Sequence, residues 1–207
     1  MPTRAEIAAT FDTIAAEFAA TRRRPWPETS RFAAGLPPGS RVLDLGCGSG
    51  RNAIVLRDAG HSVVGLDASR GLLSFAAAKV GTGSLAQGDA VMLPFRSGSF
   101  DAIHSIAAIH HMPSEDERRQ LLLECRRVLR KGGVLIVSAW AVEQRRFRLI
   151  RDSTDVHVPW WKPDGTAYWR FYHLFREGEL PQLVADVGFA IERAWREGDN
   201  HVVLAGR

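Results

Sequence analysis

Three glycines at alternating positions follow an acidic residue near the end of a short apolar run. Asp44 lies in the run 42–45. Gly46, Gly48 and Gly50 come directly after that run. Glycine allows the backbone to turn sharply and lets a ligand approach where a Cβ would block it. A helix beginning after the loop would add unpaired N–H donors that face the ligand. This spacing indicates a nucleotide-type cofactor site, and a glycine-rich turn without a ligand is the alternative.

The spacing of the glycines distinguishes two classes of cofactor. Dinucleotide-binding folds favour G-x-G-x-x-G, whereas this chain has D-x-G-x-G-x-G from Asp44 to Gly50. The pattern resembles the first motif of class I S-adenosylmethionine methyltransferases. In that family the glycines lie against the methionine and ribose parts of the cofactor, and the acidic residue contacts the methionine end. The resemblance implies S-adenosyl-L-methionine as the cofactor, with an NAD-type site as a second interpretation.

Two further aspartates follow strand-like runs. Asp67 ends the run 61–67, and an acidic residue at the carboxyl end of that strand is placed to accept the ribose hydroxyls. The segment 84–90 resembles the third strand of the same family, which implies that Asp89 accepts the adenine amino group. Ala90 and Leu93 would then flank the adenine ring. The predicted cofactor-binding residues are Asp44, Gly46, Cys47, Gly48, Gly50, Asn52, Asp67, Ala68, Asp89, Ala90, Leu93 and Ser105.

Two adjacent histidines follow the predicted strand 100–106. In open α/β sheets the reacting site lies beyond the carboxyl ends of the strands. That position brings His110 and His111 near the transferred group. A single histidine is more often structural, but a pair at this position favours a function in binding substrate.

Arginines and tryptophans occur together at two places. Residues 22–24 are all arginine and precede Trp26, and the cluster 145–148 follows Trp140. Prolines on both sides of Trp26 make the first segment stiff and extended. The segment is either a linker with solvated charges or a lid whose arginines bind an anion.

The remaining pattern predicts the elements that position these residues. We expect helices over 3–20, 52–59 and 70–80, a helix from Ser114 that ends at Gly132 and Gly133, and another helix around Pro181. We expect strands over 41–45, 61–67, 84–90, 100–106 and 134–139, and a hairpin of 189–195 and 201–205. The prediction is a Rossmann-like α/β fold, with a seven-stranded, mostly parallel sheet, a terminal antiparallel hairpin and helices on both faces. The whole chain, 1–207, is then one domain, with an N-terminal helix and lid (1–30) and an irregular substrate-recognition loop (141–173).

Composition sets outer bounds on the function. The chain has 207 residues and a net charge of +4, which permits a polyanionic partner without requiring one. The two cysteines are not spaced as a disulfide framework or a zinc site. The N-terminus lacks the apolar core of a signal peptide, and we find no apolar run of membrane-spanning length, so we expect a cytoplasmic protein.

Several strings outside the cofactor motifs resemble one subfamily of methyltransferases. These strings lie at 21–27, 105–111, 140–144, 155–160 and 171–180. They are similar to eukaryotic tRNA methyltransferases that esterify 5-carboxymethyluridine at the wobble position, including the methyltransferase domain of the AlkB-homologue relative. The resemblance implies tRNA as a partner and a small zinc-binding activator protein that pairs with the sheet edge. This chain lacks the relatives' long polar insertion between the Val-Pro-Trp and Tyr-His strings, and Ser49 stands where the family favours asparagine.

A carboxylate nucleophile would set simple demands on the enzyme. It is already ionised at neutral pH, so the protein mainly has to orient one oxygen. The planar fork of arginine suits this task, and we expect Arg22 to bind the carboxylate, with Arg24 as the second choice. The predicted catalytic residues are Arg22, His110, Tyr172 and His173, and the predicted substrate-binding residues are Arg24, Trp26, His111, Trp140, Trp160 and Arg170. A small-molecule methyltransferase and a non-catalytic cofactor-binding scaffold are the alternatives.

Overall fold

A computed structural model describes residues 1–147 and 153–207. Among these residues, seven strands form one sheet in the order β3-β2-β1-β4-β5-β9-β8. The strands are β1 (Arg41–Leu45), β2 (Ser62–Asp67), β3 (Leu85–Gln87), β4 (Phe100–Ile106), β5 (Leu129–Trp140), β8 (Ala190–Glu197) and β9 (Asn200–Gly206). The first five are parallel, and β9 runs antiparallel to both β5 and β8. The predicted mostly parallel sheet with a terminal hairpin is confirmed.

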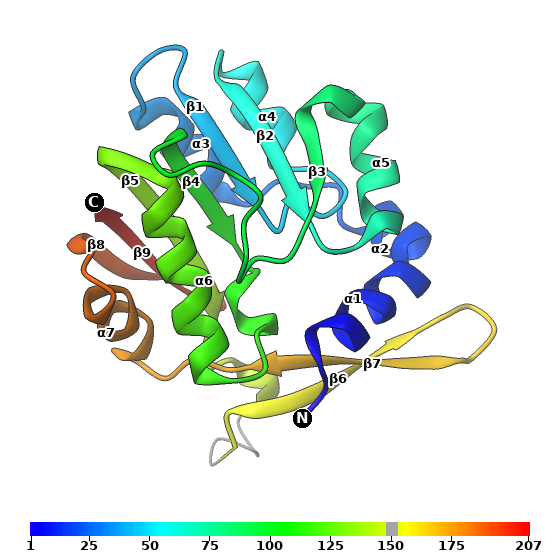
Figure 1. Cartoon of the computed structure of the whole chain (residues 1–207). Helices are drawn as coiled ribbons and strands as arrows, with labels where there is room; N and C mark the ends of the chain where they lie inside the picture. The colour runs from blue at the N-terminus through cyan, green and yellow to red at the C-terminus, as the bar shows by residue number, and fades with distance from the viewer. Residues whose placement is uncertain (148–152) are drawn as a thin grey trace.

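Helices cover both faces of this sheet (Figure 1). They are α1 (Arg4–Thr13), α2 (Ala15–Thr21), α3 (Pro27–Gly35), α4 (Ala53–Asp58), α5 (Arg70–Val80), α6 (Glu115–Val128) and α7 (Glu179–Asp186). Within the described ranges, none of the helices has both the length and the apolar character needed to cross a bilayer.

Alternating side chains of β1 enter two separate cores. Val42 packs in one core with Phe32 of α3 and Leu56 of α4. Leu43 packs in the other core with Leu121 of α6. Successive side chains of a strand point to opposite faces, so a parallel strand that is apolar at both positions must be covered by helices on both sides. The sheet is therefore the middle layer of three.

The N-terminal helix predicted over 3–20 is divided in two. The predicted capping box of Thr3 and Glu6 is present and begins α1. The backbone leaves helical geometry at Ile14, with φ −101° and ψ 8°, before α2 begins. Ile14 is fully buried, and both helices pack against α5. The break lets both helices follow the surface of α5, a tertiary contact that helical periodicity does not specify.

The predicted end of α6 at Gly132 and Gly133 is wrong. The helix ends at Val128, and strand β5 begins at the next residue, Leu129, which pairs with Phe100. A Cβ on Gly133 would lie 2.8 Å from the carbonyl oxygen of Asp101. That glycine therefore permits close strand packing and does not terminate the helix.

The stretch predicted to be an irregular substrate-recognition loop, 141–173, contains regular structure. Strands β6 (Asp155–Trp161) and β7 (Ala167–His173) form a separate antiparallel ribbon. This ribbon and helix α1 lie side by side beyond the carboxyl ends of the parallel strands (Figure 1). The predicted substrate-recognition loop is thus largely a β-hairpin, and Arg148 of the basic cluster lies outside the described residues.

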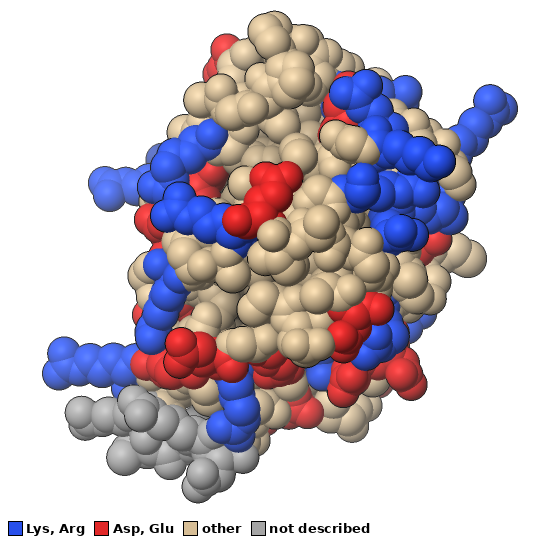
Figure 2. Space-filling model, turned by 90° about the vertical axis from the view of Figure 1, so that its left-hand side faces the viewer, with Lys and Arg blue, Asp and Glu red and all other residues tan. Residues whose placement is uncertain are grey.

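The side of the molecule that carries β8 shows no single charged surface. In Figure 2, separate groups of basic side chains lie at the left and right of this side, with acidic side chains among them and uncharged atoms across the centre. On this side, therefore, the net positive charge of the chain does not form one continuous basic surface.

Candidate active site

A pocket of about 530 Å³ lies where several strands end. Its walls include Leu45 at the end of β1, Leu66 and Asp67 at the end of β2, Gln87 at the end of β3 and Ile106 at the end of β4. The predicted residues that line it are Gly46, Cys47, Gly48, Asn52, Asp67, Ala68, Asp89, Ala90, Arg22 and His111. The structure thus brings most of the predicted cofactor residues together at the carboxyl edge of the sheet.

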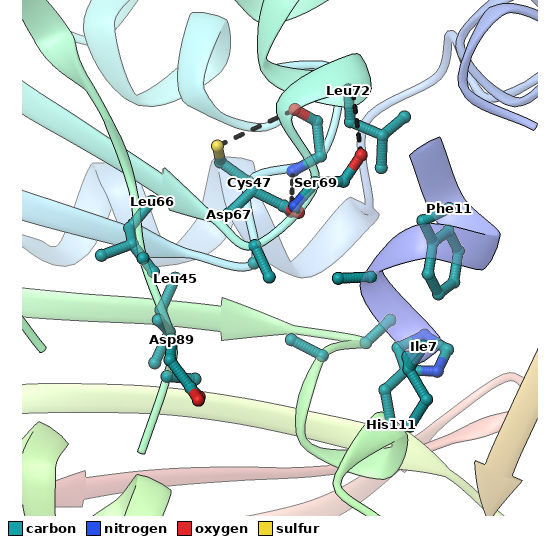
Figure 3. Close-up of a pocket in the computed structure, with 18 of the residues that line it drawn as sticks. Ile7, Phe11, Leu45, Cys47, Leu66, Asp67, Ser69, Leu72, Asp89 and His111 are labelled. Carbon is teal, nitrogen blue, oxygen red and sulfur yellow. Dashed lines mark hydrogen bonds between the residues drawn. The ribbon is translucent and has the colours of Figure 1, made fainter. Parts of the chain in front are cut away.

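The glycine loop and the end of β2 are joined through one carboxylate. Asp67 Oδ2 accepts a 2.8 Å hydrogen bond from the Gly48 N–H, and Asp67 Oδ1 accepts one of 2.9 Å from Ser69 N–H (Figure 3). Burial raises the pKa of Asp67 to about 6, although these two hydrogen bonds lower it. Gly48 has φ 53°, and a Cβ there would meet no atom within 4 Å. The turn therefore needs glycine for its conformation, and it leaves open space beside the carboxylate.

Asp89 lies at the other side of the pocket from His111 in Figure 3. Its Oδ2 accepts a 2.8 Å hydrogen bond from Arg4 Nε, and its Oδ1 accepts one of 3.1 Å from Val91 N–H. Arg4 also bonds Glu117 of α6 through Nη1. The first residue of α1 is thereby fixed to Asp89, which lines the pocket, and to α6.

The N-terminal helices form a cover over the pocket. Ile7, Phe11 and Phe18 line it, and Figure 3 shows Ile7 and Phe11 beside His111. Asp12 Oδ1 accepts hydrogen bonds from the Ser69 hydroxyl, at 2.6 Å, and from the Gly71 N–H, at 2.7 Å. The apolar spacing of these residues predicts one buried face, but the sequence does not show that this face covers a pocket.

Asp44 is buried in a polar network and does not line the pocket. Its Oδ1 lies 2.8 Å from His104 Nδ1, and His104 Nε2 lies 3.0 Å from Thr29 Oγ1. Asn52 Oδ1 accepts from the Thr29 hydroxyl, at 3.3 Å, and from the Trp26 N–H, at 3.1 Å. The network connects the first strand to the Arg-Pro-Trp segment. The second oxygen of Asp44, Oδ2, has no protein partner in the described chain.

Three other predicted cofactor residues lie behind the pocket wall. Gly50 has φ 78°, and a Cβ there would lie 3.2 Å from Ala76 Cα. Leu93 is in the core, and its N–H donates to Glu124. Ser105 is fully buried. These residues support the loops that line the pocket and do not reach it.

The two adjacent histidines have opposite hydrogen-bond roles. His110 Nδ1 accepts from the Trp140 N–H at 3.0 Å, so its proton is on Nε2. His111 Nδ1 lies 3.0 Å from the Phe171 carbonyl oxygen, so it donates, and its Nε2 carries the lone pair. Burial lowers the pKa of His111 to about 4 and lowers the pKa of His110 well below its usual value. Both imidazoles are therefore neutral at neutral pH. Only His111 lines the pocket.

Tyr172 is the centre of a group of rings and guanidinium groups beside the histidines. Trp140 stacks on it with centroids 4.0 Å apart, and Arg170 Nη1 donates to its hydroxyl at 2.7 Å. Arg146 lies over Trp140 at 3.9 Å. Burial lowers the pKa of Arg170, and nearby Arg22 and Arg146 lower it further. We call Arg22, Arg146 and Arg170 the arginine cluster.

None of these three guanidinium groups forms an ion pair with a carboxylate in the part of the chain that the structure describes. Arg170 is only 5% exposed, and its Nε has no protein partner there. Of the three, Arg170 is buried, whereas Arg22 and Arg146 are exposed. A buried cation is normally paired, so Arg170 without a carboxylate, beside two further guanidinium groups, is suited to binding an anionic ligand.

His173 is placed away from the pocket. Its Nδ1 lies 2.7 Å from Asp155 Oδ1, and its Nε2 lies 2.6 Å from Glu179 Oε1. Burial raises the pKa of Glu179, but hydrogen bonds from His173 and from the Arg176 N–H outweigh it and leave that pKa lowered. His173 therefore joins the base of the ribbon to α7, and the structure does not bring it to the predicted catalytic group.

The predicted aromatic and basic side chains near the N-terminus divide between two places. Trp26 lies 5.1 Å from the Arg51 guanidinium, and Arg51 also donates to the Arg24 carbonyl. The Arg24 residue is exposed and does not line the pocket. Trp160 packs against Phe18 of the cover, with centroids 5.5 Å apart. Of Trp26, Arg24 and Trp160, therefore, Trp160 is the one for which the described structure shows a contact with the cover of the pocket.

Some residues of this site are absent from the sequence-based prediction. Arg51 and Met112 line the pocket, and Arg146 completes the arginine cluster. The basic cluster 145–148 beside Trp140 is the signal that could have indicated Arg146. Arg51 directly follows the last glycine of the loop, whereas no pattern distinguishes Met112.

Comparison with known proteins agrees with this geometry. The methyltransferase domain family matches residues 43–137, which include the glycine loop, Asp67 and Asp89. The tRNA (carboxymethyluridine(34)-5-O)-methyltransferase of Schizosaccharomyces pombe is 36% identical over 94% of this chain and 93% of its own length. This chain belongs to the S-adenosylmethionine-dependent methyltransferase family. It is an enzyme, and its cofactor is S-adenosyl-L-methionine.

This chain spans different shares of the other proteins to which it is similar. A Xenopus tropicalis tRNA (carboxymethyluridine(34)-5-O)-methyltransferase is 30% identical over 94% of this chain, which spans 39% of that longer protein. A methyltransferase structure from Methanosarcina mazei has a TM-score of 0.73 at 23% identity, covering 89% of this chain and 98% of its own. A Haloferax volcanii methyltransferase, solved with the Trm112 activator, has a TM-score of 0.72 at 20% identity, covering 97% and 96%. The two structures share the fold.

The pocket of this methyltransferase fits the chemistry of its cofactor. Asp67 is mostly ionised at neutral pH and has lone pairs left to accept ribose hydroxyls beyond its two backbone bonds. Gly48 leaves open space where a side chain would project. Apolar Leu66, Ala90 and Leu121 line the pocket together with Asp89, as suits a flat ring with a polar edge.

Proposed function

We propose that this methyltransferase esterifies a carboxylate, and that the carboxylate is the carboxymethyl group of a wobble uridine in tRNA. The observation that carries the proposal is the arginine cluster. Arg22 lines the cofactor pocket. Arg146 and Arg170 lie close enough to Arg22 for its charge to lower the pKa of both. Three guanidinium groups without a carboxylate partner in the described chain favour an anionic substrate.

The proposed mechanism depends on positioning. Bound S-adenosylmethionine supplies an electrophilic methyl group. The arginine cluster orients the ionised carboxylate, which needs no base because its pKa lies far below neutral pH. Neutral His110 offers an Nε2–H donor beside Tyr172, with ring centroids 5.1 Å apart. The cover of Ile7, Phe11 and Phe18 excludes water from the reacting atoms.

Relatives support the identity of the substrate. The Schizosaccharomyces pombe protein and a Saccharomyces cerevisiae protein, 34% identical over 74% of this chain, are both named as methyltransferases of carboxymethyluridine 34 in tRNA. A uridine bearing a carboxymethyl group combines an aromatic ring with an anion. That combination suits a site where Trp140, Tyr172 and the arginine cluster lie together.

We also infer that an activator protein binds the free edge of β3. In the described sheet this strand, Leu85–Gln87, has β2 as its single neighbour. An unpaired strand edge presents N–H and C=O groups to another chain. The Haloferax volcanii methyltransferase, which shares this fold, is solved with the Trm112 activator. Copurification of a small zinc-binding protein with the methyltransferase, lost when Ala86 is replaced by proline, tests this inference.

Mass spectrometry of tRNA nucleosides from a strain that lacks the gene tests the proposed substrate. We expect 5-carboxymethyluridine to accumulate and its methyl ester to disappear. Unchanged wobble nucleosides would contradict the proposal. Purified enzyme with labelled cofactor then separates the alternatives: label in a small metabolite indicates a small-molecule methyltransferase, and no transfer to any acceptor indicates a scaffold.

A further inference from the structure

One side of the β6–β7 ribbon packs against the rest of the protein. Trp160 and Tyr168 are directly opposite each other in the ribbon. Both pack against the cluster that contains Ile7 and Phe11 of α1, and Trp160 also contacts Phe18. This side of the ribbon therefore holds the cover of the active site in place.

The other side of the ribbon exposes two tryptophans. Trp161 is 65% exposed and Trp169 is 57% exposed, the largest values among the tryptophans. Trp169 is opposite Pro159, and Trp161 is two residues beyond Pro159 on the same strand. Residues two apart on a strand, and residues directly opposite, share one face. The two indoles are therefore diagonal neighbours on one face, opposite Pro159 and Ala167, and Phe171 farther along the same face of β7 is buried.

Nothing in the described fold accounts for this exposure. Tryptophan buries more apolar area than any other side chain, and leaving two of them in water forgoes that stabilisation. The inner tryptophan, Trp160, has the partners that a structural residue needs, whereas Trp161 and Trp169 contribute to none of the four hydrophobic clusters. Adjacent exposed indoles of this kind indicate a binding surface.

The charges around this face favour a polyanion. Lys162 follows Trp161, and its Nζ is 3.6 Å from Glu17 of α2. Arginines 22–24 follow α2, and the Arg22 guanidinium lies 5.5 Å from the ring of Trp160. Glu17 pairs with Lys162, and Asp164 keeps its negative charge while it accepts from the Thr166 N–H within its own turn. Arginines 22–24 form no ion pair among the described residues, so the net charge beside the ribbon is positive.

The ribbon that carries this face borders the active site. Arg22 lines the pocket and contacts Trp160, which is on the opposite side of the ribbon from Trp161 and Trp169. A macromolecule that places one nucleotide in the pocket would therefore lie along the ribbon. Exposed aromatic rings beside basic residues are the usual means of holding unpaired bases, because every base offers a ring face for stacking.

We propose that Trp161 and Trp169 form a stacking platform for the unpaired RNA bases that flank the methylated nucleotide. The proposal deepens the proposed function and rests on it for the identity of the RNA. The platform holds the loop by stacking, and Arg23 and Arg24 contact its phosphates. Specificity for the reacting base stays with the pocket.

A binding experiment with the full-length enzyme tests the platform. The probe is a fluorescein-labelled anticodon stem-loop RNA, titrated at several salt concentrations. Trp161→Ala with Trp169→Ala is expected to weaken binding at least tenfold, with an unchanged slope of log K against log salt, because phosphate contacts are kept. Trp161→Phe with Trp169→Phe should restore most of the affinity. Phe75→Ala with Leu123→Ala, which removes exposed apolar side chains elsewhere, is the matched control and should have no effect.

Kinetic measurements distinguish failure of the platform from failure of the proposed function. With tRNA as substrate, the double alanine variant should raise KM and leave kcat and cofactor affinity unchanged. If wild-type enzyme methylates tRNA and the variant keeps its KM and its RNA affinity, the platform is wrong and the proposed function stands. If wild-type enzyme methylates no tRNA while stem-loop binding still depends on the two tryptophans, the proposed function is wrong and the platform stands. Binding of a protein partner, but no RNA, through this face would overturn the platform.

Discussion

Arg4 of α1 is paired with Asp89 across the opening of the cofactor pocket, with 2.8 Å between Arg4 Nε and Asp89 Oδ2. The same arginine bonds Glu117, and further along α1 Asp12 accepts from Ser69 and Gly71. These contacts hold α1 against residues that follow β2 and β3 and against α6. Because α1 lines the pocket, we expect these contacts to open when the cofactor is exchanged.

Replacing Arg4 by alanine should therefore speed exchange. Arg4 is about one-third exposed, so each ion pair is expected to contribute only about 0.5 kcal/mol. The dissociation rate of S-adenosylhomocysteine, measured by stopped-flow fluorescence, should rise about threefold to tenfold. Arg31→Ala, which breaks a surface ion pair with Glu197 away from the pocket, is the control. An unchanged rate would show that α1 does not limit release.

Cofactor binding should depend on pH through Asp67. Burial raises the pKa of this carboxyl to about 6, and only the ionised form accepts both ribose hydroxyls. Affinity for the cofactor should fall about tenfold from pH 7 to pH 5, as for one ionisation linked to binding. The sign is opposite for stability: without cofactor, the contribution of Asp67 to the free energy of unfolding is full below pH 4 and is lost as pH rises through about 6.

Isothermal titration calorimetry across this range measures the effect on binding. The asparagine of Asp67→Asn cannot ionise. The cofactor affinity of this variant should be lower than that of the wild type and should not change near pH 6. A step of unchanged size in the Asn variant would assign the titration to another group.

The arginine cluster should affect turnover more than cofactor binding. Arg22→Ala and Arg146→Ala each remove a cation from the proposed carboxylate site, and a reduction in kcat of about 10²-fold is expected for each. Equilibrium affinity for S-adenosylhomocysteine should change less than about twofold. Arg24 is exposed and does not line the pocket, so Arg24→Ala should retain most of the kcat. A large loss of cofactor affinity in Arg22→Ala would contradict the proposed position of the substrate.

His104 should be important for stability. It is fully buried and bonds the carboxyl group of Asp44, which has no other hydrogen-bond partner among the described residues. His104→Ala leaves a buried carboxylate without its partner, and the free energy of unfolding should fall by about 3–5 kcal/mol. Asp44→Asn with His104→Ala should be no less stable than His104→Ala alone. Urea unfolding of His104→Ala, Asp44→Asn and the double variant without cofactor measures the coupling, and additive losses would indicate that the pair does not interact.

The sequence by itself determined the order of the seven strands of the main sheet and where β1, β2, β4 and β5 end, but not α3 or the β6–β7 ribbon. Alternation in the run 42–45, the glycine loop and the capping pattern at Ser114 are local, because backbone hydrogen bonds and side-chain direction depend on residues close in the chain. For that reason Asp67 and Asp89 could be predicted at the carboxyl edge of the sheet, and the structure has them in one pocket.

Only the tertiary structure decided which side chains meet. Arg22, Arg146 and Arg170 come from three distant segments, and their convergence depends on how α2 and the ribbon pack. The same packing pairs Asp44 with His104 and turns Trp161 and Trp169 outward, while His173 is bound between two carboxylates. Such contacts depend on the relative placement of whole elements, which is set by the burial of their apolar faces, and residue spacing along the chain does not encode it.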